Sequence, residues 1–126
     1  MELLKTPLER LIQERQLLAD LENEQPDFKI QEWNSTATNE LHLNFSLRIG
    51  SNDFNGVLVY PELFPELPAY IRPQKSGERW SILHQYGSSG VLCLEYGPDN
   101  WNTNISGVDL VRSAQLLLLT DAMTVL

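Results

Sequence analysis

The chain has little cysteine, little histidine and no long apolar run, and each shortage excludes a class of protein. Cys93 is the one cysteine among 126 residues, so no disulfide can form within the chain. The two histidines, His42 and His84, give no spacing typical of a metal site, and we expect neither a metal nor a cofactor. The longest aliphatic run, residues 116–119, is far too short to cross a bilayer.

Positive charge is also scarce. Nine lysines and arginines stand against 17 aspartates and glutamates, which gives a formal net charge of −8 and a pI of about 4.6. Nucleic-acid binding needs a basic surface that displaces counterions, and an anionic membrane attracts the same residues, so we expect neither partner. An acidic chain is better suited to a basic protein surface. The single cysteine and the lack of a visible signal peptide predict a cytoplasmic location.

The length of 126 residues predicts a single domain that spans residues 1–126. A helix is predicted over residues 6–23, because Thr6 is a suitable N-cap, Pro7 suits the first helical position, and Glu9 completes a capping box. Pro26 prevents continuation. Glu14 is predicted on the polar side of this helix. The predicted core side has helical spacing and consists of Leu4, Leu8, Leu11, Ile12, Leu18 and Leu21.

After this helix the hydrophobic period changes to two, which is typical of strands. Strands are predicted at residues 28–33, 41–49 and 57–60, with turns at 34–39 and 50–53, and a fourth short strand at 70–72. Because the links are short, an antiparallel meander is the simplest topology. The predicted fold class is therefore α+β.

The second half of the chain is less regular. Residues 61–68 contain three prolines, which cannot lie inside a helix or a sheet, so this strap is predicted to be ordered but irregular. Residues 73–92 form a long connection, and loops of that length in compact domains are usually functional or disordered. Ser106 and Asp109 form a second capping box. The apolar stripe that follows predicts a C-terminal helix and consists of Leu110, Val111, Ala114, Leu117 and Leu118.

Cys93 lies in the segment Gly90-Val91-Leu92-Cys93-Leu94. A free cysteine between leucines is either a small buried hydrophobe or a nucleophile, and the residues alone leave both open.

The order of the elements and several motifs resemble the ubiquitin-conjugating family, and the resemblance covers nearly the whole chain. The matching features are the strap from Tyr60 to Pro68, His84 at the start of the family's His-Pro-Asn, the Gly90-to-Leu94 segment, Trp101 at the family's distance from the cysteine, and Asn104-Ile105-Ser106 before the last helix. In combination and in this order they favour a nucleophilic Cys93.

The chain also departs from the family. His84-Gln85-Tyr86 replaces His-Pro-Asn, and the distance from histidine to cysteine is one residue shorter, so the asparagine near the thioester oxyanion is missing from its usual place. Ala69 replaces a proline of the strap, and the fold is predicted to be shortened, with the family's two C-terminal helices absent or reduced. Together with the acidity, these departures are most similar to divergent bacterial members.

The resemblance implies a cysteine carrier, an acyl transferase of the conjugating type. Cys93 would accept a ubiquitin-like modifier as a thioester from an adenylating enzyme and pass it to an amine of a target protein, normally a lysine. His84 would order the active-site loop, and Trp101 would wedge that loop against the last helix. Asn102 is the favoured replacement for the missing oxyanion donor; Asn100, Asn104 and Gln85 are the alternatives.

Two other functions stay open. A non-catalytic adaptor of the same fold would bind a ubiquitin-like protein without chemistry, although inactive relatives usually lack the cysteine. A cysteine hydrolase would need a base within reach of Cys93, and His84 is the candidate nearby.

Overall fold

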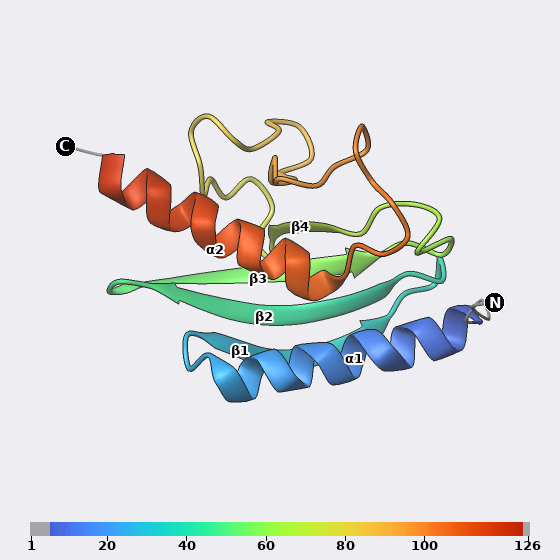
Figure 1. The fold of residues 1–126 in the computed structure, drawn as a ribbon. Helices are drawn as coiled ribbons and strands as arrows, with labels where there is room; N and C mark the ends of the chain where they lie inside the picture. Colours follow the sequence, from blue (N-terminus) through green and yellow to red (C-terminus); the bar gives the residue numbers. More distant parts are fainter. Residues whose placement is uncertain (1–5, 125–126) are drawn as a thin grey trace.

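The structure is a computed structural model that describes residues 6–124. Along the chain follow α1 (Pro7–Glu24), β1 (Phe28–Ser35), β2 (Leu41–Ile49), β3 (Asn52–Tyr60), β4 (Tyr70–Pro73) and α2 (Gly107–Thr124), as Figure 1 shows. The predicted α+β class, with a helix at each end of a four-stranded antiparallel sheet, is confirmed. Among residues 6–124, neither helix has the length and apolar character needed to span a membrane.

The strands pair in the order β1-β2-β3-β4, so the meander predicted from the short links is present. Three strands are longer than predicted, because β1 extends to Ser35, β3 begins at Asn52 rather than at residue 57, and β4 extends to Pro73. Gly50 explains part of the difference. With a φ of 63°, a value that favours glycine, it lets the chain reverse directly between β2 and β3, so the polar residues beside it still pair.

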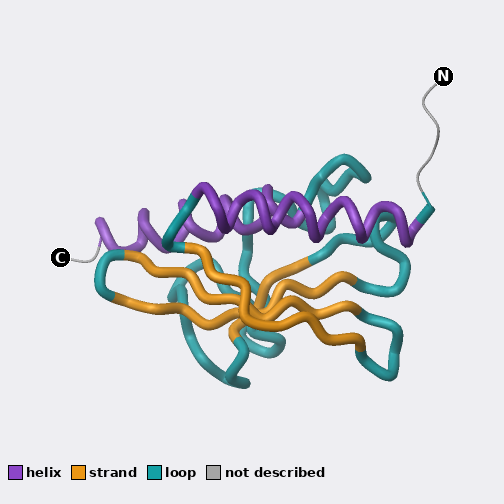
Figure 2. Tube along the Cα trace, turned by 90° about the horizontal axis from the view of Figure 1, so that it is seen from below, coloured by secondary structure: helices purple, strands orange, loops and turns teal. Residues whose placement is uncertain are grey.

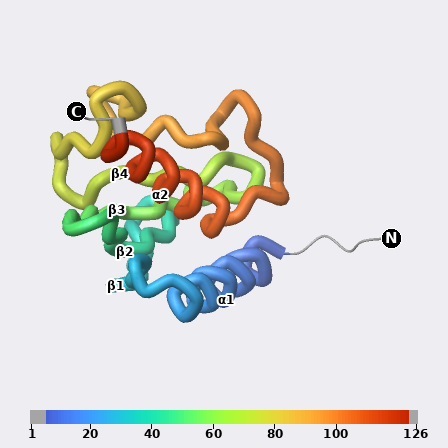
Figure 3. Tube along the Cα trace, turned by 60° about the vertical axis from the view of Figure 1, so that its left-hand side comes forward, coloured from blue at the N-terminus to red at the C-terminus, as the bar shows by residue number. Residues whose placement is uncertain are grey.

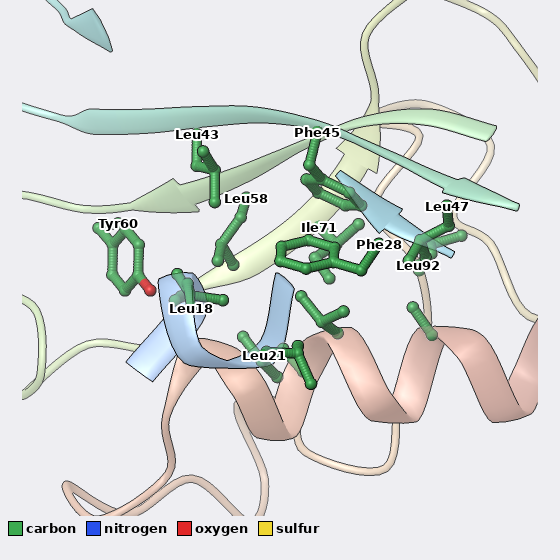
Figure 4. Packing of buried hydrophobic residues seen from close by; sticks show 14 of the residues in the cluster. Leu18, Leu21, Phe28, Leu43, Phe45, Leu47, Leu58, Tyr60, Ile71 and Leu92 are labelled. Carbon is green, nitrogen blue, oxygen red and sulfur yellow. The ribbon is translucent and has the colours of Figure 1, made fainter. Parts of the chain in front are cut away.

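Both helices lie on the same face of the sheet, which gives a two-layer molecule (Figure 2). The core lies between the layers, where Leu43, Phe45 and Leu47 of β2 point inward at every second position (Figure 4). Leu58 of β3 and Ile71 of β4 extend this apolar layer. The inward face therefore follows directly from the period-two pattern of the sequence.

The orientation of α1 differs from the prediction. Leu18 and Leu21 are buried as expected, but Leu8 is 68% exposed and Ile12 is 59% exposed, whereas Glu14 is only 1% exposed. Leu4 lies outside the described residues. The first half of α1 therefore turns Glu14 inward and leaves Leu8 and Ile12 exposed, while Leu11 packs against the core as predicted.

The buried carboxylate explains this orientation, because it has three donors. The Tyr60 hydroxyl and the Gly107 backbone N–H donate to Glu14 Oε1 at 2.9 and 2.6 Å, and Arg10 Nε donates to Oε2 at 3.3 Å. A buried charge is tolerated when it is paired and hydrogen-bonded in this way. A side chain at Gly107 would collide with the Tyr60 hydroxyl and with Leu58, so glycine is required where α2 begins.

Burial, followed by the nearby negative charge of Glu14, raises the pKa of Tyr60 well above its usual value of 10.0. Tyr60 therefore stays protonated and keeps donating its hydrogen bond to Glu14 across the neutral range.

The strap and the start of α2 follow the sequence prediction. Residues 61–68 form turns rather than a helix or strand, and Phe64, which precedes a cis Pro65, is 3% exposed. The Ser106 backbone N–H donates to Asp109 Oδ2 at 2.9 Å, and the Asp109 N–H donates to Ser106 Oγ at 3.2 Å. This reciprocal pair is the predicted capping box, and it fixes the direction in which α2 leaves the loop.

Candidate functional site

Residues 74–106 connect β4 to α2 without a further helix or strand, and we call them the cysteine loop. Figure 3 shows it, in yellow and orange, running beside α2. Within it, the Leu92 N–H donates to the Ile71 carbonyl at 2.9 Å, which attaches the segment before Cys93 to β4. After Cys93, the Glu95 N–H donates to Ser113 Oγ of α2 at 2.9 Å. Cys93 is therefore held on both sides.

The thiol of Cys93 is free, and its residue is half-buried, unlike the fully buried Leu92 before it. A cysteine that serves only as a small core residue would be expected to lie fully inside the apolar cluster. Cys93 is therefore less buried than the core leucine before it.

His84 lies next to Cys93 through the main chain. The Cys93 N–H donates to the His84 carbonyl at 2.8 Å, and the Tyr86 N–H donates to the Val91 carbonyl at 2.9 Å, so the two limbs run antiparallel. The His84 side chain is exposed and makes no hydrogen bond within residues 6–124. The structure thus brings the predicted pair together by its backbone, while the imidazole points to solvent.

Gln85 is buried and its carboxamide is fully used. The oxygen Oε1 accepts from the backbone N–H groups of Trp80 and Ser81, at 2.7 and 3.2 Å. The nitrogen Nε2 donates to the carbonyls of Glu78 and Gly90, at 2.8 and 3.0 Å. Both amide hydrogens are occupied, so Gln85 has none left for an oxyanion. The alternative that Gln85 is the missing donor therefore does not fit this geometry.

Trp80 is the main apolar anchor of the first half of the cysteine loop. It is 8% exposed, and its ring packs edge-on against Phe54 with a centroid distance of 5.3 Å. Gly56 makes room for it, since a Cβ there would lie 2.6 Å from Trp80 Cη2. The indole N–H donates to Glu78 at 2.9 Å. The irregular segment is therefore fixed to the sheet at this ring.

Trp101 packs against the strap. Its indole N–H donates to the Pro65 carbonyl at 2.8 Å, and its ring meets Phe64 edge-on at 6.1 Å. The residue is half-buried and packs against the core cluster. That it also wedges the loop against the last helix stays a prediction.

Asn102 follows Trp101 and is exposed. Its Oδ1 accepts from the Asn104 N–H at 2.9 Å, while its amide nitrogen donates to no group of residues 6–124. Asn100 is different, because its Nδ2 donates to the Glu95 carbonyl at 2.7 Å and its Oδ1 accepts from the Gly97 N–H at 2.8 Å. Within this part of the chain, Asn102 and Asn104 therefore keep both amide hydrogens unused, whereas Asn100 keeps one. Within the same residues, no hydrogen bond joins Trp101 or Asn102 to Cys93.

Arg10 of α1 binds the part of the cysteine loop that follows Asn102 in the chain. Its guanidinium donates to the carbonyl of Thr103 and, at 2.8 Å, to that of Ile105, and it lies over the Phe64 ring at 4.9 Å. No pattern in the sequence indicates this role, because an arginine in a mixed-charge helix face is normally solvated. Trp80 was also missed, although a tryptophan in an irregular polar segment is a usable sign of an anchor, and Gln85 was predicted only as an oxyanion donor.

Exposed apolar side chains flank His84 on the cysteine loop. Ile82 is 85% exposed, Leu83 is 82% exposed and Tyr86 is 57% exposed. Within residues 6–124, no group of three or more histidine, cysteine, aspartate or glutamate side chains is placed to hold a metal ion. The other histidine, His42, lies on β2 and is bonded to Glu40 at 3.0 Å, well separated in the sheet from the cysteine loop.

Comparison with models of known protein families, with curated proteins and with solved structures finds no match to this chain. The resemblance to the ubiquitin-conjugating family therefore depends on the motifs of the chain and their order.

Proposed function

We propose that this chain is a ubiquitin-conjugating-type carrier. In this proposal Cys93 accepts a ubiquitin-like modifier as a thioester from an adenylating enzyme and passes it to a lysine of a target protein, in the cytoplasm. The observation that carries the proposal is the half-buried position of Cys93, in a segment whose backbone N–H groups at Leu92 and Glu95 donate to β4 and α2. Transfer between acyl groups of similar energy depends mainly on positioning, which such a mounting supplies.

The chemistry needs two steps. The Cys93 thiolate attacks the carbonyl carbon of the acyl group on the activating enzyme; a carbon–sulfur bond forms, the bond to that enzyme breaks, and the leaving group departs with the electron pair. The lysine amine then attacks the thioester; a carbon–nitrogen bond forms, the carbon–sulfur bond breaks, and the amine loses a proton. Cys93 is regenerated as thiolate or thiol.

The geometry supports a carrier over a hydrolase. A hydrolytic cysteine is normally activated by a histidine that a third group orients. Here the His84 carbonyl, rather than its ring, faces the Cys93 backbone, and no group of residues 6–124 orients the imidazole. The oxyanion donor in the second step is proposed to be Asn102, whose amide hydrogens are unused.

The test is a tagged chain expressed in its own source cells and analysed on gels without reductant. We expect a heavier adduct on the wild type that dithiothreitol removes, a reductant-resistant adduct on Cys93→Ser, and none on Cys93→Ala. Mass spectrometry of the adduct identifies the attached polypeptide.

The adaptor alternative gives a different result in the same experiment. An adaptor would co-purify non-covalently with its ubiquitin-like partner from wild type and Cys93→Ala alike, with no adduct on either. That outcome, or an adduct that persists on Cys93→Ala, contradicts the carrier proposal.

A further inference from the structure

The Gln85 side chain joins two separate passes of the cysteine loop. Its oxygen accepts from Trp80 and Ser81 on one pass, and its nitrogen donates to Gly90 on another and to Glu78 where the first pass begins. Its own backbone forms a bridge with Leu92 on the limb that leads into Cys93. One buried carboxamide thus takes the place of the strand pairing that this irregular segment lacks.

This position connects Gln85 to the backbone of Cys93 through the neighbouring residue. The residue before it, His84, supplies the carbonyl that receives the Cys93 N–H at 2.8 Å. If Gln85 moves, the His84 carbonyl and the Gly90 carbonyl move with it, and both ends of the segment that positions the thiol are displaced. Leu92 is attached to β4 independently, at 2.9 Å, so the sheet does not depend on this contact.

The four hydrogen bonds of the Gln85 side chain require a carboxamide, and a side chain of similar size without one cannot form them. Two N–H groups point at one end of the side chain and two carbonyls at the other, and the residue is only 7% exposed. Methionine would fill the space but leave four buried polar groups without partners. Glutamate would keep the acceptor end and place a carboxylate oxygen against two carbonyls.

We propose that Gln85 is a positioning residue for Cys93, whose carboxamide sets the place and the accessibility of the thiol. The inference relies on the proposed function only in taking Cys93 as the reacting group, and it is tested by thiol chemistry that needs no partner protein.

The experiment measures alkylation of Cys93 by iodoacetamide in the folded full chain, for Gln85→Met and Gln85→Glu. We expect alkylation to accelerate about tenfold in Gln85→Met without denaturant, while circular dichroism shows the chain folded. The matched controls are Gln115→Met and Gln115→Glu, because Gln115 of α2 bonds Gln25, which follows α1, at 2.7 Å, and no hydrogen bond of residues 6–124 joins its side chain to the loop. The controls are expected to react like wild type.

The pH profile separates positioning from simple space filling. The new carboxyl in Gln85→Glu faces two carbonyls in a buried place, which raises its pKa above the usual value of about 4.3. When protonated it can donate to one carbonyl, and when ionised it repels both. The alkylation rate of Gln85→Glu, divided by that of wild type at each pH, is therefore expected to rise between about pH 5 and pH 8, whereas the Gln85→Met ratio stays flat.

Alkylation rates equal to that of wild type, for both variants and at every pH, would overturn the inference. If neither variant folds, amide hydrogen exchange on wild type decides. The N–H groups of Trp80, Ser81 and Cys93 are then expected to be strongly protected and to exchange together. Exchange at the rate of exposed amides would contradict the positioning role of Gln85. Failure of the proposed function looks different, since wild type would then carry no acyl group while the alkylation results above still hold.

Discussion

The helix–sheet body and the cysteine loop are stabilised in different ways. In the body, regular strands and helices bury side chains such as Leu43, Phe45 and Leu110 at positions that repeat with the period of the element. In the loop, single side chains hold irregular backbone: Trp80 by packing and Gln85 by hydrogen bonds. The difference implies that the loop can be loosened or altered while the body stays folded, as a site that admits large partners requires.

The largest expected effect concerns the buried polar cluster around Glu14 in the body. Glu14→Ala removes the acceptor of Tyr60, Gly107 and Arg10, and leaves a nearly buried guanidinium without its partner. We expect a loss of about 3–5 kcal/mol in the free energy of unfolding, measured by urea titration.

The control for this prediction is Glu24→Ala, at the exposed end of the same helix. Glu24 pairs with Arg112 at 3.7 Å on the surface, so its loss is expected to cost less than about 1 kcal/mol. Equal costs for the two variants would show that the buried cluster does not hold α1 to the start of α2.

The second prediction compares the two aromatic rings where body and loop meet. Phe64→Ala is expected to cost about 3–5 kcal/mol, because the ring is buried between Tyr60 and Trp101. Trp101→Ala is expected to cost less, because its ring is half-exposed and bonds only the Pro65 carbonyl. Thermal melts of both variants decide; a greater loss for Trp101→Ala would contradict the division between body and loop.

The difference between the body and the cysteine loop also determines which features could be predicted from the sequence. The hydrophobic period and the capping residues correctly predicted the helices, the meander and the second capping box, because each of these depends on neighbours in the chain. The inward turn of Glu14 was missed, since its donors Tyr60 and Gly107 are distant in sequence. For the candidate site, the spacing of the motifs predicted that Cys93 and His84 lie close together.

The anchors of the loop could not be predicted in the same way. Whether Gln85 bonds the backbone or an oxyanion depends on where Glu78 and Gly90 lie in space. The packing of Trp101 on the strap depends in the same way on the position of the Pro65 carbonyl. Neither arrangement repeats with a period, so no pattern in the sequence reports it.

The third prediction concerns Asn102 on the loop. After Cys93 is charged, a chase with free lysine is expected to show discharge about 10²–10³-fold slower in Asn102→Ala, with charging unchanged, because one oxyanion donor is lost. Asn104→Ala is the neighbouring control, since its amide is also exposed. Slow discharge in Asn104→Ala alone would move the role to that residue, and normal discharge in both would contradict a side-chain donor in this segment.

The smallest expected effect is a loss of stability at alkaline pH that depends on Tyr60 in the body. Because the pKa of Tyr60 is raised in the folded chain, its contribution to stability is complete below pH 10, the usual value, and is lost as pH rises toward the folded-state pKa. Above pH 10 the free energy of unfolding of wild type is expected to fall by up to about 1.4 kcal/mol per pH unit more than that of Tyr60→Phe. Tyr86→Phe, at an exposed position, is expected to keep the wild-type slope.

The central claim is that Cys93 carries an acyl group, and intact-mass analysis of the reconstituted reaction tests it most directly. The chain is mixed with its adenylating enzyme, the ubiquitin-like modifier and ATP, then measured before and after dithiothreitol. We expect a mass increase equal to the modifier minus one water, complete reversal by dithiothreitol, and no increase for Cys93→Ala. An unmodified wild-type chain in the presence of a charged activating enzyme, or an equal increase on Cys93→Ala, would contradict the account.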